Sequence, residues 1–325
     1  MNMSGAFNNV HHKRLIHNLR TRHVPKVLTT WIQSFFSNRS TQLSINNELT
    51  QLIPVRAGVP QGSPLLPLLH MYYNADLLDS TEGENSEPDR MSLGFIDDIT
   101  YGMAGHSDRE NVRKLKGMLE KAKEWRIKHG AKFQRSKYVL VHFTRNHNKS
   151  TIASIQIDSI TIPVSNEARY LRVIFDQQLR FHLHLQQAVK QGTSAALALK
   201  SIGKCTWGSL YQYIRQLYQS TIVPRTDYGA IIWHYPNDSS YQSTQASKLD
   251  KVQRLAMRAI LGCFRTTSTI AMEVETCLMP TWLRLQKKVL LLATHIKALS
   301  PSHPIAFWIN MPYAYEYQLH ALLHL

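Results

Sequence analysis

The chain has 325 residues, of which 38 are Lys or Arg and 22 are Asp or Glu, so its formal net charge is +16. A hydrophobic fraction of 43% argues against a disordered chain, and this length suits two or three modules with a sizeable core. The basic excess favours a polyanionic partner, of which nucleic acid is the simplest, although net charge can also serve solubility alone.

Cysteine and histidine usage gives no pattern of a disulfide framework or a zinc site. The widely spaced cysteines favour a reduced intracellular compartment; they are Cys205, Cys263 and Cys277. Histidines at 11–12 and at 182 and 184 lack companion ligands at metal-site spacing, so we interpret them as surface or core histidines. The apolar run at 289–293 is far shorter than the about 20 residues of a membrane span, and no signal-peptide pattern appears, so we expect no membrane partner.

The first elements alternate between helix and hairpin patterns. We predict helix over residues 12–38, broken at Pro25, and then a short hairpin in which residues 41–45 and 52–55 flank an Asn-Asn pair. Residues 79–90 are polar and acidic, which indicates a surface loop.

A tight hairpin is predicted next, over residues 93–101, with Asp97 and Asp98 in its turn. Ser107 and Glu110 form a capping box at the start of a helix that Gly130 ends. Further strands are predicted at 138–144, 155–158, 160–164 and 170–176.

The later part of the chain has helical patterns. They cover residues 181–202, 208–222, 247–262 and 281–299, with a Ser-, Gln- and Asn-rich loop at 235–246. A mixed α/β half followed by an all-helical half predicts a boundary near residue 178.

Asp97 and Asp98 form a like-charged pair inside an apolar, strand-like run. Two adjacent carboxylates repel each other and are costly to desolvate. A basic neighbour or a divalent cation would relieve that cost, and metal-dependent phosphoryl chemistry uses carboxylates in this way. The alternative is a solvated Asp-Asp turn between two strands.

Several sequence motifs on both sides of the Asp97–Asp98 pair indicate its function. Residues 58–64 read Gly-Val-Pro-Gln-Gly-Ser-Pro, and residues 95–98 read Phe-Ile-Asp-Asp. Together they resemble the palm of reverse transcriptases, in the form carried by non-LTR (LINE-type) retrotransposons. Further blocks of that family resemble residues 4–10 with His12, residues 126–145, residues 170–173, residues 228–230 with Trp233, and residues 252–254 with Gly262.

The resemblance implies an α/β fold: a partial polymerase palm with an antiparallel sheet over residues 1–178, followed by an all-helical thumb and connection region over residues 179–325. The implied activity is RNA-directed DNA polymerisation, a nucleotidyl transfer that uses an RNA template, a DNA primer and deoxynucleoside triphosphates. Mg²⁺ or Mn²⁺ is the implied cofactor, and the nucleus is the implied place of action. We recognise no fingers, endonuclease or RNase H region, and therefore expect a truncated copy.

The implied catalytic centre is altered at one position. Asp97 corresponds to a metal ligand with Asp98 beside it, and hard cations prefer carboxylate oxygens. The further Asp that the family places in its first block corresponds to Asn2, which keeps a carbonyl oxygen and loses the charge. We therefore expect weaker metal binding and less transition-state stabilisation.

Other site residues follow from the resemblance. Phe7 would exclude a 2′ hydroxyl from the nucleotide sugar, Gln61 and Gly62 would line the template–nucleotide pocket, and Lys137 would give a proton to pyrophosphate. Without the family resemblance, Phe7 could equally be a side chain of the hydrophobic core, and Lys137 could simply be an exposed lysine. Contacts with the nucleic-acid backbone are expected from five cations: Arg145, Lys200, Lys204, Arg215 and Arg254.

Two further departures stand out: Arg172 replaces a glycine, and Leu66 stands where the family often has Ser. We favour a catalytically impaired copy that still binds nucleic acid. The alternatives are an active polymerase whose fingers are supplied elsewhere and a domesticated, non-catalytic nucleic-acid-binding protein.

Overall fold

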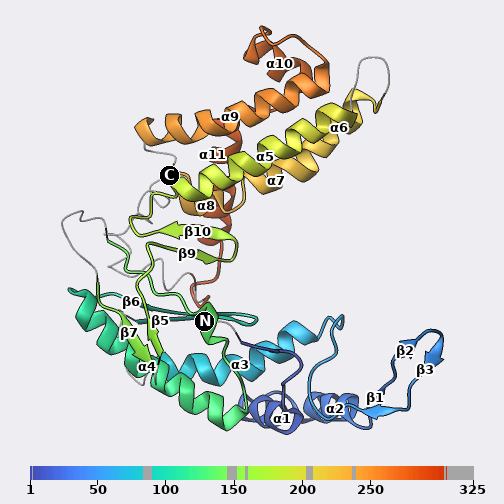
Figure 1. Cartoon of the computed structure of the whole chain (residues 1–325), viewed down its shortest axis with the longest axis vertical. Helices are drawn as coiled ribbons and strands as arrows, with labels where there is room; N and C mark the ends of the chain where they lie inside the picture. The colour runs from blue at the N-terminus through green and yellow to red at the C-terminus, as the bar shows by residue number, and fades with distance from the viewer. Residues whose placement is uncertain are drawn as a thin grey trace. The chain divides into compact units, whose positions relative to one another are not determined.

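The computed structural model describes residues 1, 3–82, 90–144, 152–157, 160–202, 208–235, 239–303 and 305. The chain forms two compact units (Figure 1). The first comprises Met1–His142 with Asn146–Asn166, and the second comprises Phe143–Arg145 with Glu167–Leu325. The palm–thumb boundary near residue 178 stays a prediction. In the described ranges, no helix is both long and apolar enough to cross a membrane.

Four helices build most of the first unit. They are α1 (His12–Thr21), α2 (Lys26–Phe36), α3 (Leu66–Glu82) and α4 (Asp108–His129). Pro25 is the N-cap of α2, as expected of a residue that fixes φ and lacks an N–H. The predicted capping box is confirmed in part, because the Ser107 hydroxyl accepts from the Glu110 N–H at 3.2 Å. Gly130 ends α4 with φ at +62°, also as predicted.

A long hairpin follows α2, and its strands pair in two short ladders. β1 (Ser40–Thr41) pairs with β4 (Ile53–Pro54), and β2 (Ser44–Ile45) pairs with β3 (Glu48–Leu49). Asn46 and Asn47 both have positive φ, which is the two-residue turn that Asn favours in hairpins. The predicted turn is therefore confirmed, while the returning strand begins at Glu48, earlier than the sequence pattern indicates.

The second hairpin carries the acidic pair. β5 (Arg90–Phe95) and β6 (Asp98–Met103) are antiparallel, and Phe95 faces Asp98 across the ladder. The two-residue turn is therefore Ile96–Asp97, and Asp98 is the first residue of β6 rather than a turn residue. The predicted 79–90 loop is shorter than expected because α3 runs to Glu82; residues 83–89 lie outside the described part.

The remaining strands of the first unit are β7 (Ile155–Ile157) and β8 (Ile160–Ile162), paired as predicted. The strand predicted at 138–144 is wrong: that segment forms one isolated bridge, Leu140 with Val164. Among the described residues every ladder has two strands, so the fold is mixed helix with small antiparallel sheets. The core lies between α1, α3, α4 and β6, and includes Leu15, Leu19, Leu77, Ile99 and Trp125.

The second unit opens with a hairpin that the sequence pattern merged into one strand. β9 (Glu167–Tyr170) and β10 (Val173–Asp176) pair around Leu171 and Arg172, both with positive φ. The predicted strand over 170–176 is thus wrong in its first half, because period-2 alternation continues through a two-residue turn. Arg172, with φ at +69°, holds a backbone conformation that favours glycine.

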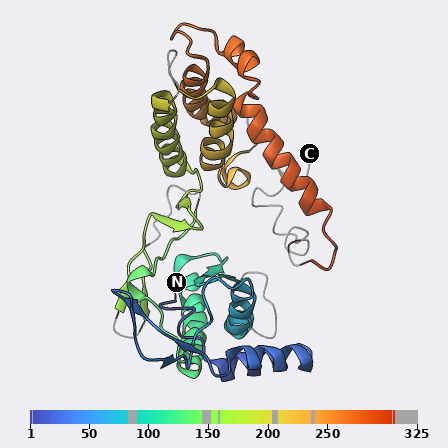
Figure 2. The same ribbon diagram turned by 90° about the vertical axis from the view of Figure 1, so that its right-hand side faces the viewer.

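Helices follow in the described part of the second unit. They are α5 (His182–Ile202), α6 (Tyr211–Leu217), the π turn η2 (Tyr218–Ile222), α7 (Val223–Thr226), α8 (Ala230–Trp233), α9 (Ser239–Leu261), α10 (Thr269–Thr276) and α11 (Thr281–Lys297). The four predicted helices are confirmed, and α8 and α10 are not foreseen from the sequence. Helices α5 and α9 lie side by side, and α11 packs along α8 and α9 (Figure 2). The predicted loop at 235–246 is wrong over most of its length, because α9 begins at Ser239.

A buried carboxylate ties these helices together. The Asp227 side chain is fully buried and accepts from Arg284 Nε and Lys288 Nζ, each at 2.8 Å. Arg284 also donates to Gln253 Oε1, which accepts from the Tyr218 hydroxyl at 3.1 Å. The network joins η2, α9 and α11 to the segment that follows α7.

Candidate functional site

The start of the chain lies against the turn that carries Asp97. The Met3 N–H donates to the Asp97 carbonyl at 3.0 Å, and the Ile99 N–H donates to the Met1 carbonyl at 2.8 Å. On its other side, Met3 forms an antiparallel bridge with Phe133. The first sequence block and the acidic pair, about ninety residues apart, are therefore neighbours in space. Asn2 itself lies outside the described residues.

The Gly-Val-Pro-Gln-Gly segment joins the same place. The Val59 N–H donates to the Phe7 carbonyl and the Gly58 N–H to the Val10 carbonyl, both at 2.9 Å. Gly58 has φ at +91°, and a Cβ there would come within 3.0 Å of the Asn8 carbonyl oxygen. Only glycine permits this close approach of the two backbones. The structure therefore explains why the block begins with a glycine.

Two buried side chains of helix α3, His70 and Asn74, lie next to the Ile96–Asp97 turn. The Asn74 amide donates to the Ile96 carbonyl at 2.9 Å and lies 3.0 Å from His70 Nδ1. The His70 ring meets Phe7 edge-on, with ring centroids 5.0 Å apart. Burial lowers the pKa of His70, although the Asp97 charge and the Ala6 backbone act in the other direction. Burial therefore favours the neutral form of the His70 imidazole.

Sequence reasoning missed His70 and Asn74. Their only sequence signal is the spacing of four residues, which places both polar side chains on one face of a helix that is otherwise apolar there. On a buried helical face, such a pair indicates hydrogen bonds to each other or to a neighbouring element.

The acidic pair offers a small donor set. Asp97 and Asp98 are both half-buried, and their oxygens are ligands that Mg²⁺ and Mn²⁺ accept. Within the described ranges, no group of three or more His, Cys, Asp or Glu side chains is placed to hold a metal ion. The residues present thus fit a hard divalent cation in chemical kind, with two carboxylates as the candidate donors.

The other predicted nucleotide-site residues are accessible. Gln61 and Gly62 are exposed in the turn before α3. Gly62 has φ at +94°, and a Cβ there would meet no atom within 4 Å, so the surface beside it is open. Lys137 is exposed at the end of the 3₁₀ turn η1 (Arg135–Lys137).

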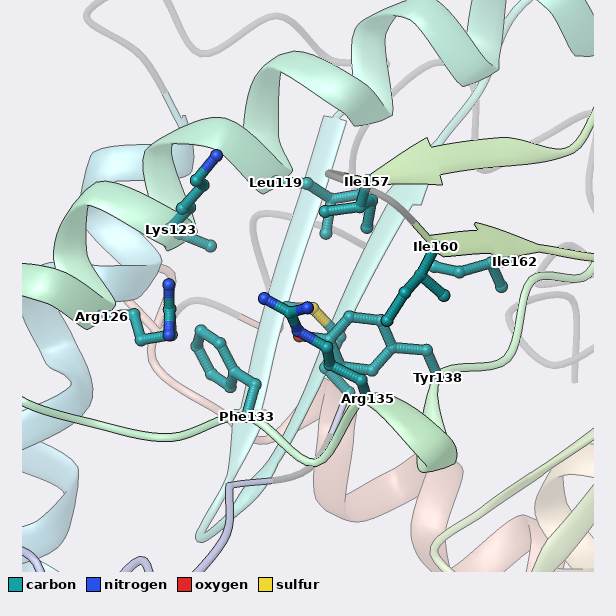
Figure 3. A pocket seen from close by; sticks show the side chains of 11 residues that line it. Leu119, Lys123, Arg126, Phe133, Arg135, Tyr138, Ile157, Ile160 and Ile162 are labelled. Carbon is teal, nitrogen blue, oxygen red and sulfur yellow. The ribbon is translucent and has the colours of Figure 1, made fainter.

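A small pocket lies beside η1, between α4 and the β7–β8 hairpin (Figure 3). Lys123, Arg126 and Phe133 line one side of it, and isoleucines that include Ile157 and Ile160 line the opposite side. Its cavity volume is about 40 Å³, too small for a nucleotide, and Lys137 does not line it.

The predicted backbone-contacting cations in the second unit have different surroundings. Lys200 is exposed on α5, and Arg254 is half-buried on α9. Arg215 donates to the Thr276 carbonyl at 2.6 Å and to the Cys277 carbonyl at 3.1 Å, so its guanidinium caps the end of α10. Arg145 and Lys204 lie outside the described residues. Contact of any of these cations with nucleic acid stays a prediction.

Comparison with known proteins agrees with the sequence blocks. Residues 1–175 match the family described as "Reverse transcriptase (RNA-dependent DNA polymerase)". The chain is 26% identical over 264 residues to "Probable RNA-directed DNA polymerase from transposon BS" of Drosophila melanogaster, covering 81% of this chain and 28% of that protein. It is 25% identical over 243 residues to "Probable RNA-directed DNA polymerase from transposon X-element" of the same species, covering 71% and 25%.

A third relative is "RNA-directed DNA polymerase from mobile element jockey" of Drosophila funebris, 25% identical over 186 residues, covering 57% of this chain and 20% of that protein. The chain thus spans about a quarter of the length of these curated relatives. With the family matched over more than half of its residues, the chain belongs to the reverse transcriptases, in the form carried by LINE-type, non-LTR retrotransposons.

Proposed function

We propose that this chain binds an RNA template paired with a DNA primer, and that its polymerase activity is weak because Asn2 replaces a carboxylate. The observation that carries the proposal is the meeting of three separate blocks at one place. Met3 bonds to Asp97, Val59 bonds to Phe7, and the Asn74 amide bonds to Ile96, the first residue of the Ile96–Asp97 turn. These contacts bring the three sequence blocks together. We infer that a primer end and a nucleotide would meet on the surface that they form.

Each residue then has a chemical task. Asp97 and Asp98 would hold the divalent cation, which supplies charge stabilisation for phosphoryl transfer when bound. The Phe7 ring excludes a 2′ hydroxyl, and the open surface at Gly62 admits the template–nucleotide pair. Lys137, exposed and positively charged, gives its proton to the leaving pyrophosphate.

Loss of one carboxylate weakens this site by electrostatics. An amide oxygen is a neutral donor, so the cation gains less from Asn2 than from an aspartate. Because catalysis rests on stabilising charge that develops at the phosphate, the rate falls more than binding of the nucleic acid does. Phosphate contacts from Lys200 and Arg254 do not depend on the cation.

An active polymerase is the second candidate. The retained Asp97–Asp98 pair and the hydrogen-bonded turn beneath it favour this alternative. A domesticated protein that only binds nucleic acid is a third.

Primer extension on an RNA template, with Mg²⁺ or Mn²⁺, tests the proposal directly. We expect little or no extension, together with salt-dependent binding to an RNA–DNA hybrid. Robust extension that Asp97→Ala abolishes would establish the active alternative and contradict impairment. Absence of hybrid binding at low salt would contradict the proposal itself. A hybrid-binding measurement on Asp97→Ala serves as the control, because removing this carboxylate should leave the phosphate contacts in place.

A further inference from the structure

Two buried polar side chains on α3 lie where Phe7 meets the turn that carries Asp97. His70 is 1% exposed and Asn74 is 6% exposed, on a helix face whose other buried residues are apolar. Burying a polar side chain is costly unless it is hydrogen-bonded. The bonds of this pair therefore matter to the local structure, and the proposed function assigns no role to His70.

One amide nitrogen makes both bonds of the pair. Asn74 Nδ2 donates to the Ile96 carbonyl at 2.9 Å and lies 3.0 Å from His70 Nδ1. Because an amide nitrogen only donates, Nδ1 is the acceptor, and neutral His70 carries its proton on Nε2. The imidazole consequently orients the amide: with one hydrogen on His70, the other points at Ile96.

The turn that receives this bond needs support. Ile96 has φ at +55°, a conformation that β-branched residues rarely adopt. Such a conformation persists only when its surroundings enforce it. Asn74 holds the Ile96 carbonyl and the Met3 N–H holds the Asp97 carbonyl, so the turn is fixed by bonds from two separate segments.

His70 is itself fixed in orientation. Its ring lies edge-on to Phe7, with 5.0 Å between centroids and 63° between planes. Its Nε2 atom is buried and has no hydrogen bond of ordinary geometry within the described part of the chain, although the Ala6 backbone is near enough to act on the ring's pKa. The Nδ1 contact with Asn74, at 3.0 Å, is therefore the side-chain hydrogen bond that couples the ring to the turn.

We propose that His70, acting through Asn74, is a positioning residue that sets the Ile96–Asp97 turn and thereby the direction of the Asp97 carboxylate. As far as it concerns metal binding, this inference rests on the proposed function. Its structural part does not, because it concerns hydrogen bonds between residues of the chain alone.

Four variants of the full chain test the inference. His70→Phe keeps a ring and removes the acceptor, His70→Gln keeps an acceptor and removes the ring, and Asn74→Leu removes the donor. Met71→Gln is the matched control, since Met71 is 63% exposed on the same helix. Amide hydrogen exchange at Met3 and Ile99 reports the turn, exchange along α4 reports global stability, and Mn²⁺ titration reports the carboxylates.

We expect His70→Phe and Asn74→Leu to speed exchange at Met3 and Ile99 by about five- to tenfold, the loss of one hydrogen bond, with α4 unchanged. Mn²⁺ affinity should fall about tenfold, as when the partner of a metal ligand is removed. His70→Gln should restore much of the protection, and Met71→Gln should match the parent chain.

Unchanged exchange at Met3 and Ile99 in both His70→Phe and Asn74→Leu would overturn the inference, as would equal loss in His70→Phe and His70→Gln. If Asn74→Leu does not fold, the comparison of the two His70 variants decides. A parent chain that binds no Mn²⁺ through Asp97 would contradict the metal part of the proposed function alone, and the exchange rates would still decide on positioning.

Discussion

At the scale of single residues, the proposed function makes the amide at position 2 the cause of weak catalysis. Replacing Asn2 with Asp adds a carboxylate to the block whose neighbour Met3 bonds to Asp97. A third charged oxygen donor should tighten Mn²⁺ binding by about tenfold or more. Isothermal titration with Mn²⁺ measures the change, and primer extension shows whether activity follows.

A control variant with the same added charge tests whether position 2 binds the ion directly or only adds negative charge near it. Asn8→Asp adds the same charge at an exposed position of the same segment. It should leave Mn²⁺ affinity within about twofold of the parent chain, because an exposed charge is well screened in salt. Equal tightening in both variants would show that position 2 does not hold the ion.

Arg172 gives a second prediction at this scale. Its φ of +69° is costly for a residue with a Cβ, by about 1–2 kcal/mol. Arg172→Gly should therefore stabilise the second unit by about 1 kcal/mol, after the extra entropy of glycine in the unfolded chain. Urea unfolding measures this. Arg169→Gly, within the extended strand β9, should instead destabilise by about 0.5–1 kcal/mol.

At the scale of elements, Asp227 joins three helical segments. Asp227→Ala removes the carboxylate that pairs with Arg284 and Lys288 and leaves a largely buried guanidinium unpaired. The expected loss is about 3–5 kcal/mol in the free energy of unfolding. Lys288→Ala should cost about 1 kcal/mol or less, because that side chain is 40% exposed. Urea unfolding of both variants checks the ranking, and equal losses would contradict it.

The same network predicts a pH dependence. Burial opposes ionisation of Asp227, but Arg284 and Lys288 outweigh it and lower the pKa below the usual value of 3.8. A lowered pKa in the folded state means that the stabilisation is complete above about pH 4 and is lost as the pH falls through the folded-state pKa. Unfolding measured between pH 7 and pH 2 should show this acid loss, and Asp227→Asn should show less of it.

Sequence reasoning succeeded where a local signal fixes the element. Ser107, Glu110 and Gly130 mark the ends of α4, and Asn46-Asn47 marks a turn, because capping and positive φ depend on neighbours in the chain. It failed at 138–144, where alternation is present but only one bridge forms. The split at Leu171–Arg172 was also hidden, since no glycine marks that turn.

The candidate site divides in the same way. Its blocks could be recognised from sequence because a family resemblance depends on residue identity, as at Asp97, Gln61 and Phe7. Their meeting through Met3 and Val59 depends on tertiary bonds between distant segments. His70 and Asn74 belong to no block that sequence reasoning used, and only packing reveals that they support the turn.

At the scale of the whole molecule, the net charge of +16 is the property that a nucleic acid would meet first. Neutralising phosphates releases counterions, so the binding constant falls steeply with salt. Each cation that contacts a phosphate contributes about one to the slope of log K against log salt. Counting cations in the sequence does not identify the contacts, because some guanidinium groups already have structural partners.

Lys200, Arg254 and Arg215 should therefore behave differently. Lys200→Ala and Arg254→Ala should each reduce the salt slope for RNA–DNA hybrid binding by about one, with little change in unfolding free energy. Arg215→Ala removes two bonds to the end of α10 and should cost about 1–3 kcal/mol of stability. Fluorescence anisotropy over a salt series, paired with urea unfolding, separates the two effects. A reduced slope with unchanged stability in Arg215→Ala would place that arginine on the nucleic acid and not on α10.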